Sequence, residues 1–116
     1  MKNGRKKHKN TLSRGSVKYV VFSEGNIWYA AGLEFNIVES GDNPREALLL
    51  LFEALTGYVE AAKKYKVRPS ILNQKIDPEL ELLWENVRTK KETKPSVFAT
   101  GELNLRELVQ REPAYV

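Results

Sequence analysis

The chain has 116 residues, of which 41% are hydrophobic and 29% charged, and a net charge of +4. This length predicts a single domain with a modest core. Because the chain has no cysteine, disulfides, thiolate nucleophiles and cysteine-based zinc sites are excluded. No apolar run reaches the roughly 20 residues that a membrane span needs, and no apolar stretch follows the basic N-terminus as in a secretory signal. We therefore expect a cytoplasmic protein without a membrane partner.

The positive charge is concentrated at the N-terminus. Residues 1–18 contain seven Lys or Arg and no acid, whereas the rest of the chain contains twelve basic and fifteen acidic residues. Residues 1–16 have almost no large apolar side chains, which predicts a disordered basic arm. Two interpretations stay open, a solubilising extension and an arm that binds nucleic-acid phosphates. The nucleic-acid-binding hypothesis rests on Arg5, Lys6, Lys7, Lys9 and Arg14.

Three segments rich in β-branched and aromatic residues follow, at 17–23, 27–33 and 34–39. Glu24, Gly25 and Asn26 separate the first two, which predicts a β-hairpin, and the third segment predicts another strand. The first two segments carry large residues on both faces, but one helix covers only one face of a sheet. The second face of the sheet therefore either binds a partner or is covered by a helix that comes later in the chain.

Aromatic residues on the first two strands are the candidates for partner contact, because buried aromatic side chains dominate interface energetics. Adjacent residues of a strand point to opposite faces, so one of Trp28 and Tyr29 must point away from the helix. The competing interpretation is that a helix at 78–90 covers that face with Trp84. The full partner-binding hypothesis comprises Tyr19, Val21, Trp28 and Tyr29.

A long helix is predicted at 44–66. Asn43 is a helix-capping residue, Pro44 suits the first helical position, and Glu46 can complete a capping box. Apolar residues then recur at helical spacing and form a wide stripe that needs a sheet to cover it. Further apolar residues on another side of this helix, together with the two-sided strands, predict a homodimer or a higher homo-oligomer.

The C-terminal part predicts less regular structure. Residues 67–72 read as an extended piece that can add an edge strand, residues 78–90 as a second helix, and residues 105–109 as a final helical turn or two. The predicted organisation is a basic arm at 1–16, a core domain at 17–72 and a helical extension at 73–116. The predicted fold class is α+β, with a three- to four-stranded antiparallel sheet, one long helix on one face, and the order β-β-β-α-(β)-α.

The chain carries no catalytic constellation. Its one histidine lies in the basic arm, and no phosphate-binding glycine motif occurs. Glu34, Glu39 and Asp42 are close in sequence and leave an acid/base or metal site as a minor alternative. We therefore predict a protein that is not an enzyme and has no catalytic residue, cofactor or metal.

The stretch 19–62 resembles the core domain of the HicB family of antitoxins. The residues that carry the resemblance are SGDNPREA at 40–47, similar to the start of the family's helix, and YVEA at 58–61, similar to its end. The loop at 32–36 lacks the proline and cysteine that the family usually has there. No pair of DNA-recognition helices is recognisable after residue 76.

The resemblance implies a HicB-like antitoxin, or an orphan relative, that binds and neutralises a small ribonuclease toxin. The implied partner is a small basic HicA-like protein, which an acidic body suits because complementary potentials speed encounter. Two other classes stay open: a nucleic-acid-binding protein that acts through its basic arm, and an enzyme that depends on Glu34 or Asp42.

Overall fold

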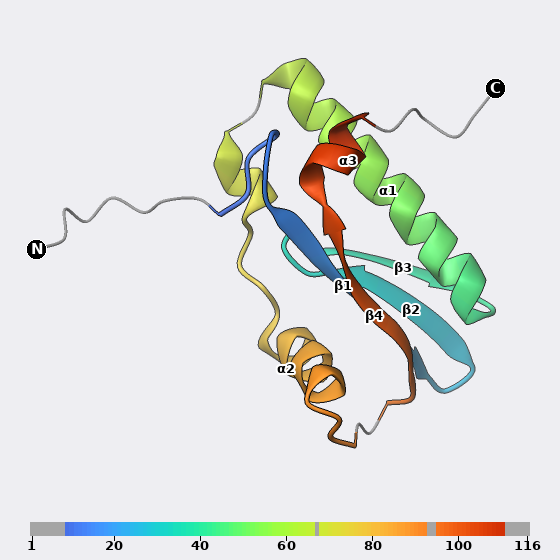
Figure 1. Cartoon of the computed structure of the whole chain (residues 1–116). Coiled ribbons are helices and arrows are strands. Elements are labelled where there is room, and N and C mark those ends of the chain that lie inside the picture. Colours follow the sequence, from blue (N-terminus) through green and yellow to red (C-terminus); the bar gives the residue numbers. More distant parts are fainter. Residues whose placement is uncertain (1–8, 67, 93–94, 111–116) are drawn as a thin grey trace, which may run out of the picture.

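The protein has an α+β fold, as the sequence predicts. The computed structural model describes residues 9–66, 68–92 and 95–110. A four-stranded antiparallel sheet of strand order β3-β2-β1-β4 carries the long helix α1 on one face and the shorter helix α2 on the other (Figure 1). The strands are β1 (Ser16–Glu24), β2 (Ile27–Gly32), β3 (Ile37–Gly41) and β4 (Val97–Asn104). The helices are α1 (Pro44–Tyr65), the 3₁₀ helix η1 (Pro69–Leu72), α2 (Pro78–Arg88) and α3 (Leu105–Gln110).

Strand β1 lies in the interior of the sheet and is buried on both faces. Val17 and Val21 belong to the core between the sheet and α1, whereas Val20 and Phe22 belong to a second core beneath α2. Leu83 and Trp84 of α2 complete that second core. The helix at 78–90 therefore covers the second face of the sheet, and this outcome decides between the two interpretations of the two-sided strands.

The start of α1 follows its sequence signals. The Glu46 N–H donates to the Asn43 side chain at 2.9 Å, Pro44 occupies the first turn, and the Glu46 carboxylate accepts from the Asp42 N–H at 2.7 Å. The helix ends where Lys66 adopts a left-handed conformation with φ of 51°. Its buried stripe includes Leu51, Leu55 and Val59, which are fully enclosed. Burying each of these side chains stabilises the fold by about 1.5–3 kcal/mol.

The third strand begins later than predicted. Residues 33–36 form a turn rather than the start of a strand, and Asn36 takes a left-handed φ of 57° that a strand does not allow. The pairing between β1 and β2 ends just before this turn, where the Glu34 carboxylate accepts the Lys18 N–H at 2.8 Å. A side chain here replaces a strand carbonyl, which periodicity alone does not reveal.

The fourth strand lies elsewhere than predicted. Residues 69–72 form η1, not an edge strand, and residue 67 is outside the described part. The fourth strand is β4, which pairs antiparallel with β1 along most of its length. The predicted division into a core at 17–72 and a helical extension at 73–116 is therefore wrong, because a strand from the second segment completes the sheet of the first. The final helix α3 is confirmed, and its Leu105 and Leu108 are buried against α1.

The predicted disorder of residues 1–16 is wrong for residues 10–16. Asn10 is fully buried, and its side-chain amide donates to the Leu72 carbonyl at 2.9 Å while its oxygen accepts from the Ser16 N–H at 2.9 Å. Asn73 closes the clamp, since its side chain accepts from the Asn10 N–H and donates to the Asn10 carbonyl. Residues 1–8 lie outside the described part of the chain.

Candidate partner-binding surface

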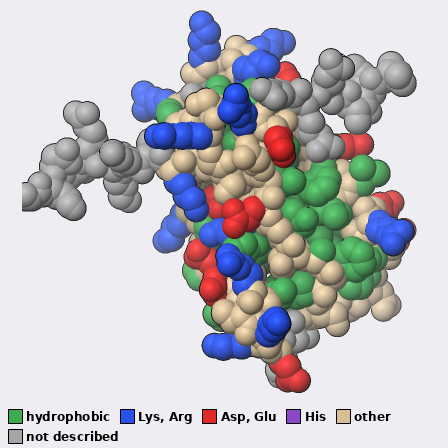
Figure 2. All heavy atoms as spheres, viewed as in Figure 1, with side chains coloured by type: hydrophobic (Ala, Val, Ile, Leu, Met, Phe, Trp, Pro, Cys, Tyr) green, Lys and Arg blue, Asp and Glu red, His purple; other side chains and the backbone are tan. Residues whose placement is uncertain are grey.

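Four aromatic side chains from four different elements form two pairs on the α1 side of the sheet. Helix α1 packs mainly against β2 and β3, so part of β1 and β4 is left uncovered beside it. Figure 2 shows the hydrophobic side chains gathered in this area, between the N-terminal half of α1 and β4. We call the following set the aromatic face: Tyr19 of β1, Trp28 of β2, Phe52 of α1 and Phe98 of β4.

The aromatic face is held in place by two edge-to-face pairs. The ring centroids of Tyr19 and Phe52 are 5.6 Å apart at an interplanar angle of 84°, and those of Trp28 and Phe98 are 6.3 Å apart at 76°. These are favourable arrangements of aromatic quadrupoles. The Tyr19 ring lies over Gly101 of β4, where a β-carbon would come within 2.8 Å of the ring. The absence of a side chain at Gly101 therefore lets Tyr19 lie flat across the strand.

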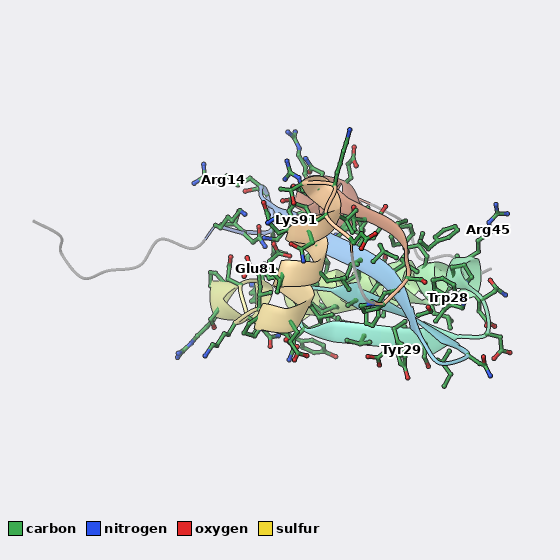
Figure 3. The ribbon with its side chains drawn as sticks, turned by 90° about the horizontal axis from the view of Figure 1, so that it is seen from below. Arg14, Trp28, Tyr29, Arg45, Glu81 and Lys91 are labelled. Atoms are coloured by element: carbon green, nitrogen blue, oxygen red, sulfur yellow. The ribbon has the colours of Figure 1, made fainter. Side chains whose placement is uncertain are left out.

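The four residues of the partner-binding hypothesis divide between three places. Tyr19 and Trp28 both belong to the aromatic face, each in its own aromatic pair, and both are partly exposed. Val21 is fully enclosed beneath α1, so its side chain is a core residue and is not available to a partner. Tyr29 projects from the opposite side of the sheet to Trp28 and stacks on Phe22, with centroids 5.6 Å apart (Figure 3).

Sequence reasoning did not place Phe98 on this surface. This residue is 47% exposed, which is high for a phenylalanine in a strand. The register between β1 and β4 shifts between Val21 and Phe22, so an extra residue of β4 is accommodated there. This β-bulge allows Phe98 to meet Trp28 and to lie on the same face as the next residue, Ala99. The available signal was the apolar run at 97–99, but three residues alone do not indicate a strand.

The three acidic candidates do not form a site. Asp42 is exposed at the start of α1, Glu39 lies in β3, and Glu34 is enclosed at the end of the β1–β2 ladder. Within residues 9–66, 68–92 and 95–110, no group of three or more acidic, histidine or cysteine side chains is placed to hold a metal ion.

Glu34 is nevertheless a buried charge with incomplete compensation. Burial raises the pKa of its carboxyl group, while the Lys18 N–H, the backbone of Glu34 and the charges of Lys18 and Lys9 act to lower it. The Lys18 ammonium is 3.7 Å from the second carboxylate oxygen and 3.6 Å from Glu81. That oxygen is buried and accepts no hydrogen bond from the described residues. The raised pKa of Glu34 is thus a consequence of its burial in the fold.

Basic side chains gather at the end of the molecule where α1 stops. The clamp on Asn10 places Lys9 beside η1, and η1 follows α1 directly in the chain. Figure 2 shows Lys and Arg side chains around this end, and we call the following exposed set the basic pole: Lys9, Arg14, Lys63, Lys64, Lys66 and Arg68. Of the nucleic-acid-binding hypothesis, Lys9 and Arg14 belong to this pole, whereas Arg5, Lys6 and Lys7 lie outside the described residues.

The opposite side of the sheet offers a smaller feature, a cleft of about 510 Å³ beside α2. Its floor includes Phe22 and Leu83, and carboxylates of Glu24, Asp77 and Glu79 line it.

None of the helices in the described part of the chain is long and apolar enough to cross a membrane. Comparison with protein-family models, with curated proteins and with solved structures finds no match to this chain.

Proposed function

We propose that the chain is a protein-binding module of the HicB-like antitoxin type, which binds a small basic ribonuclease through the aromatic face and neutralises it. The observation that carries the proposal is the aromatic face itself, in which Phe98 is 47% exposed and Trp28 and Tyr19 are partly exposed. Large apolar patches on a soluble protein mark interaction sites, and aromatic residues are favoured as binding hot spots.

The arrangement of elements agrees with the resemblance at 19–62. Three antiparallel strands are followed by one long capped helix, and the similar motif at 40–47 forms the start of α1. The aromatic face draws on strands from this stretch and on β4. The proposed partner surface therefore requires the C-terminal part of the chain as well.

A basic partner needs an orientation that keeps it away from the basic pole. The aromatic face lies beside the N-terminal half of α1, whereas the pole surrounds the C-terminal end of that helix (Figure 2). Complementary charge guides encounter, and like charge costs affinity, so the pole disfavours docking of a cationic protein on the wrong end. The aromatic contacts then supply the affinity.

The experiment compares four full-length or nearly full-length proteins in pull-downs from the native host at moderate salt: the full chain, a chain lacking residues 1–8, Phe98→Ser and Leu82→Ser. Phe98 and Leu82 are matched, since they are 47% and 60% exposed and lie on different faces. Truncation stops at residue 8 because Asn10 is part of the fold. Any ribonuclease retained is purified and assayed with increasing amounts of each protein.

The proposal predicts that a small basic ribonuclease is retained by the full chain, the truncated chain and Leu82→Ser, and that Phe98→Ser loses it. Inhibition should be complete at one equivalent, and Phe98→Ser should weaken binding at least tenfold, which corresponds to about 1.4 kcal/mol or more and approaches the loss expected for a hot-spot aromatic. A ribonuclease held equally by Phe98→Ser removes the aromatic face from the proposal. A captured protein without ribonuclease activity removes the antitoxin function.

A second candidate is nucleic-acid binding through the basic arm, and the basic pole favours it. The clamp on Asn10 holds Lys9 at the basic pole, and the sequence before it carries Lys2, Arg5, Lys6 and Lys7. Such a combination neutralises phosphates without base contacts, so affinity falls steeply with salt. Nucleic acid retained by the full chain and lost on removal of residues 1–8, with no ribonuclease present, supports this candidate over the first.

A further inference from the structure

The outer edge of β4 carries backbone groups without a strand partner in the described part of the chain. The Leu105 N–H donates to the Gly15 carbonyl at 3.0 Å, so this pair faces inward. Inward and outward residues alternate along an antiparallel strand. Leu103 and Gly101 therefore exchange hydrogen bonds with β1, and the N–H and C=O groups of Thr100 and Glu102 point outward.

This edge carries one β-bulge, at Phe98, and one charged residue, Glu102, but the regular stretch at 99–104 lacks the other features that usually prevent strand pairing. Natural edge strands are short or carry lysine, proline or covering segments. Strand β4 is eight residues long and contains neither lysine nor proline, and none of its residues is buried, whereas four residues of β1 beside it are. The other edge strand, β3, has five residues. The long edge is thus the better template for an added strand.

We propose that β4 pairs antiparallel with the β4 of a second copy, about a two-fold axis at Gly101, and so forms an eight-stranded sheet. The outward groups of Thr100 in one copy then bond those of Glu102 in the other, and the reverse. This register allows the hydrogen bonds to form, because the N–H and C=O groups of Thr100 and Glu102 both point outward from the edge of β4. It also places two glycines opposite each other at the axis, where strands approach most closely.

The side chains of β4 are self-complementary in this register. On the α2 side, the Thr100 hydroxyl faces the Glu102 carboxylate of the second copy, and on the α1 side Ala99 faces Leu103. A shift of two residues in one direction places Glu102 opposite itself, where like charges repel, and a shift in the other places Glu102 opposite Phe98. The pattern of one acid, one hydroxyl and one central glycine therefore fits a second copy of this strand.

The axis at Gly101 also joins the two aromatic faces. The Tyr19 ring lies over Gly101 on the α1 side, so the two Tyr19 rings lie next to the axis. The two-fold axis of such a pair is perpendicular to the sheet, which leaves both α1 helices on the same side. This inference goes beyond the proposed function and does not depend on what the aromatic face binds.

The test measures the mass of the full chain in solution by sedimentation equilibrium. Protein concentrations of about 1 to 100 μM cover the usual range of dimer dissociation constants. The expected result is reversible association to twice the 13.3 kDa protomer. Thr100→Pro removes one outward donor per copy and should raise the dimer dissociation constant about 10- to 100-fold. Val38→Pro is the control, because Val38 is an outward residue on the β3 edge, and it should leave association unchanged.

A pair of charge variants tests the register and keeps the proposal falsifiable if Thr100→Pro does not fold. Thr100→Glu sets two acids opposite each other twice per dimer and should weaken association about tenfold. Adding Glu102→Lys to Thr100→Glu creates opposite charges at the same contacts and should restore association to within about threefold of the original chain. A chain that stays monomeric at 100 μM overturns the proposal, as does a dimer that Thr100→Glu leaves unchanged.

Discussion

The clamp formed by Asn10 gives the sharpest test of how the N-terminal residues join the fold. Asn10→Ala removes a donor to the Leu72 carbonyl and an acceptor for the Ser16 N–H, both 2.9 Å away and both from an enclosed side chain. Each backbone group left buried without a partner costs about 1–3 kcal/mol. We therefore expect Asn10→Ala to lower the free energy of unfolding by about 2–4 kcal/mol, a large part of the about 5–15 kcal/mol that holds a typical domain together.

Urea denaturation followed by tryptophan fluorescence measures this change, because Trp28 and Trp84 report the two sides of the sheet. Asn26→Ala is the control, since Asn26 is exposed in the turn between β1 and β2. It should cost less than about 0.5 kcal/mol, as surface changes usually do. If Asn10→Ala costs no more than Asn26→Ala, residues 9–15 do not contribute to the stability of the fold, and the clamp does not operate in solution.

Two further predictions concern the same end of the sheet. Gly15→Ala should destabilise the protein by about 2 kcal/mol or more, because Gly15 has φ of 110° and a β-carbon there would overlap Asn10; Gly25→Ala, at φ of 63° with open space around it, should cost only about 1 kcal/mol in the same urea titration. Burial raises the pKa of Glu34, so its contribution to stability is complete below pH 4.5 and is lost as the pH rises through the folded value. Relative to Glu34→Gln, the original chain should therefore gain stability as the pH falls from 7 to 4; a relative loss on acidification would mean that the ion pair with Lys18 outweighs burial.

The sequence predicted the elements whose signals are local. The cap at Asn43, the proline after it and Glu46 lie within four residues of one another, and the start of α1 is found where they indicate. The turn at Gly25 likewise separates β1 from β2, since glycine supplies the left-handed φ of 63° that the turn needs.

The remaining features depend on residues far apart in the chain. The partners of Asn10 are up to 63 residues away, and β4 pairs with a strand about 80 residues earlier, so neither had a local signal to be read. The candidate site was predicted in part for the same reason. Tyr19 and Trp28 could be selected as aromatic strand residues, but Phe98 joins them only through a bulge in a distant strand.

The position of β4 also bears on when the protein can act during its synthesis. Strands β1, β2 and β3 and helix α1 are contiguous, and their pairings are available once residue 65 has been made. Strand β1 receives its second neighbour only after residue 104, and the aromatic face lacks Phe98 and the glycine beneath Tyr19 until then. At about 5–20 residues per second, residues 66–104 take a few seconds to add. A nascent chain in that interval has its long helix but not its finished aromatic surface, so recognition through that surface requires a chain that already includes β4.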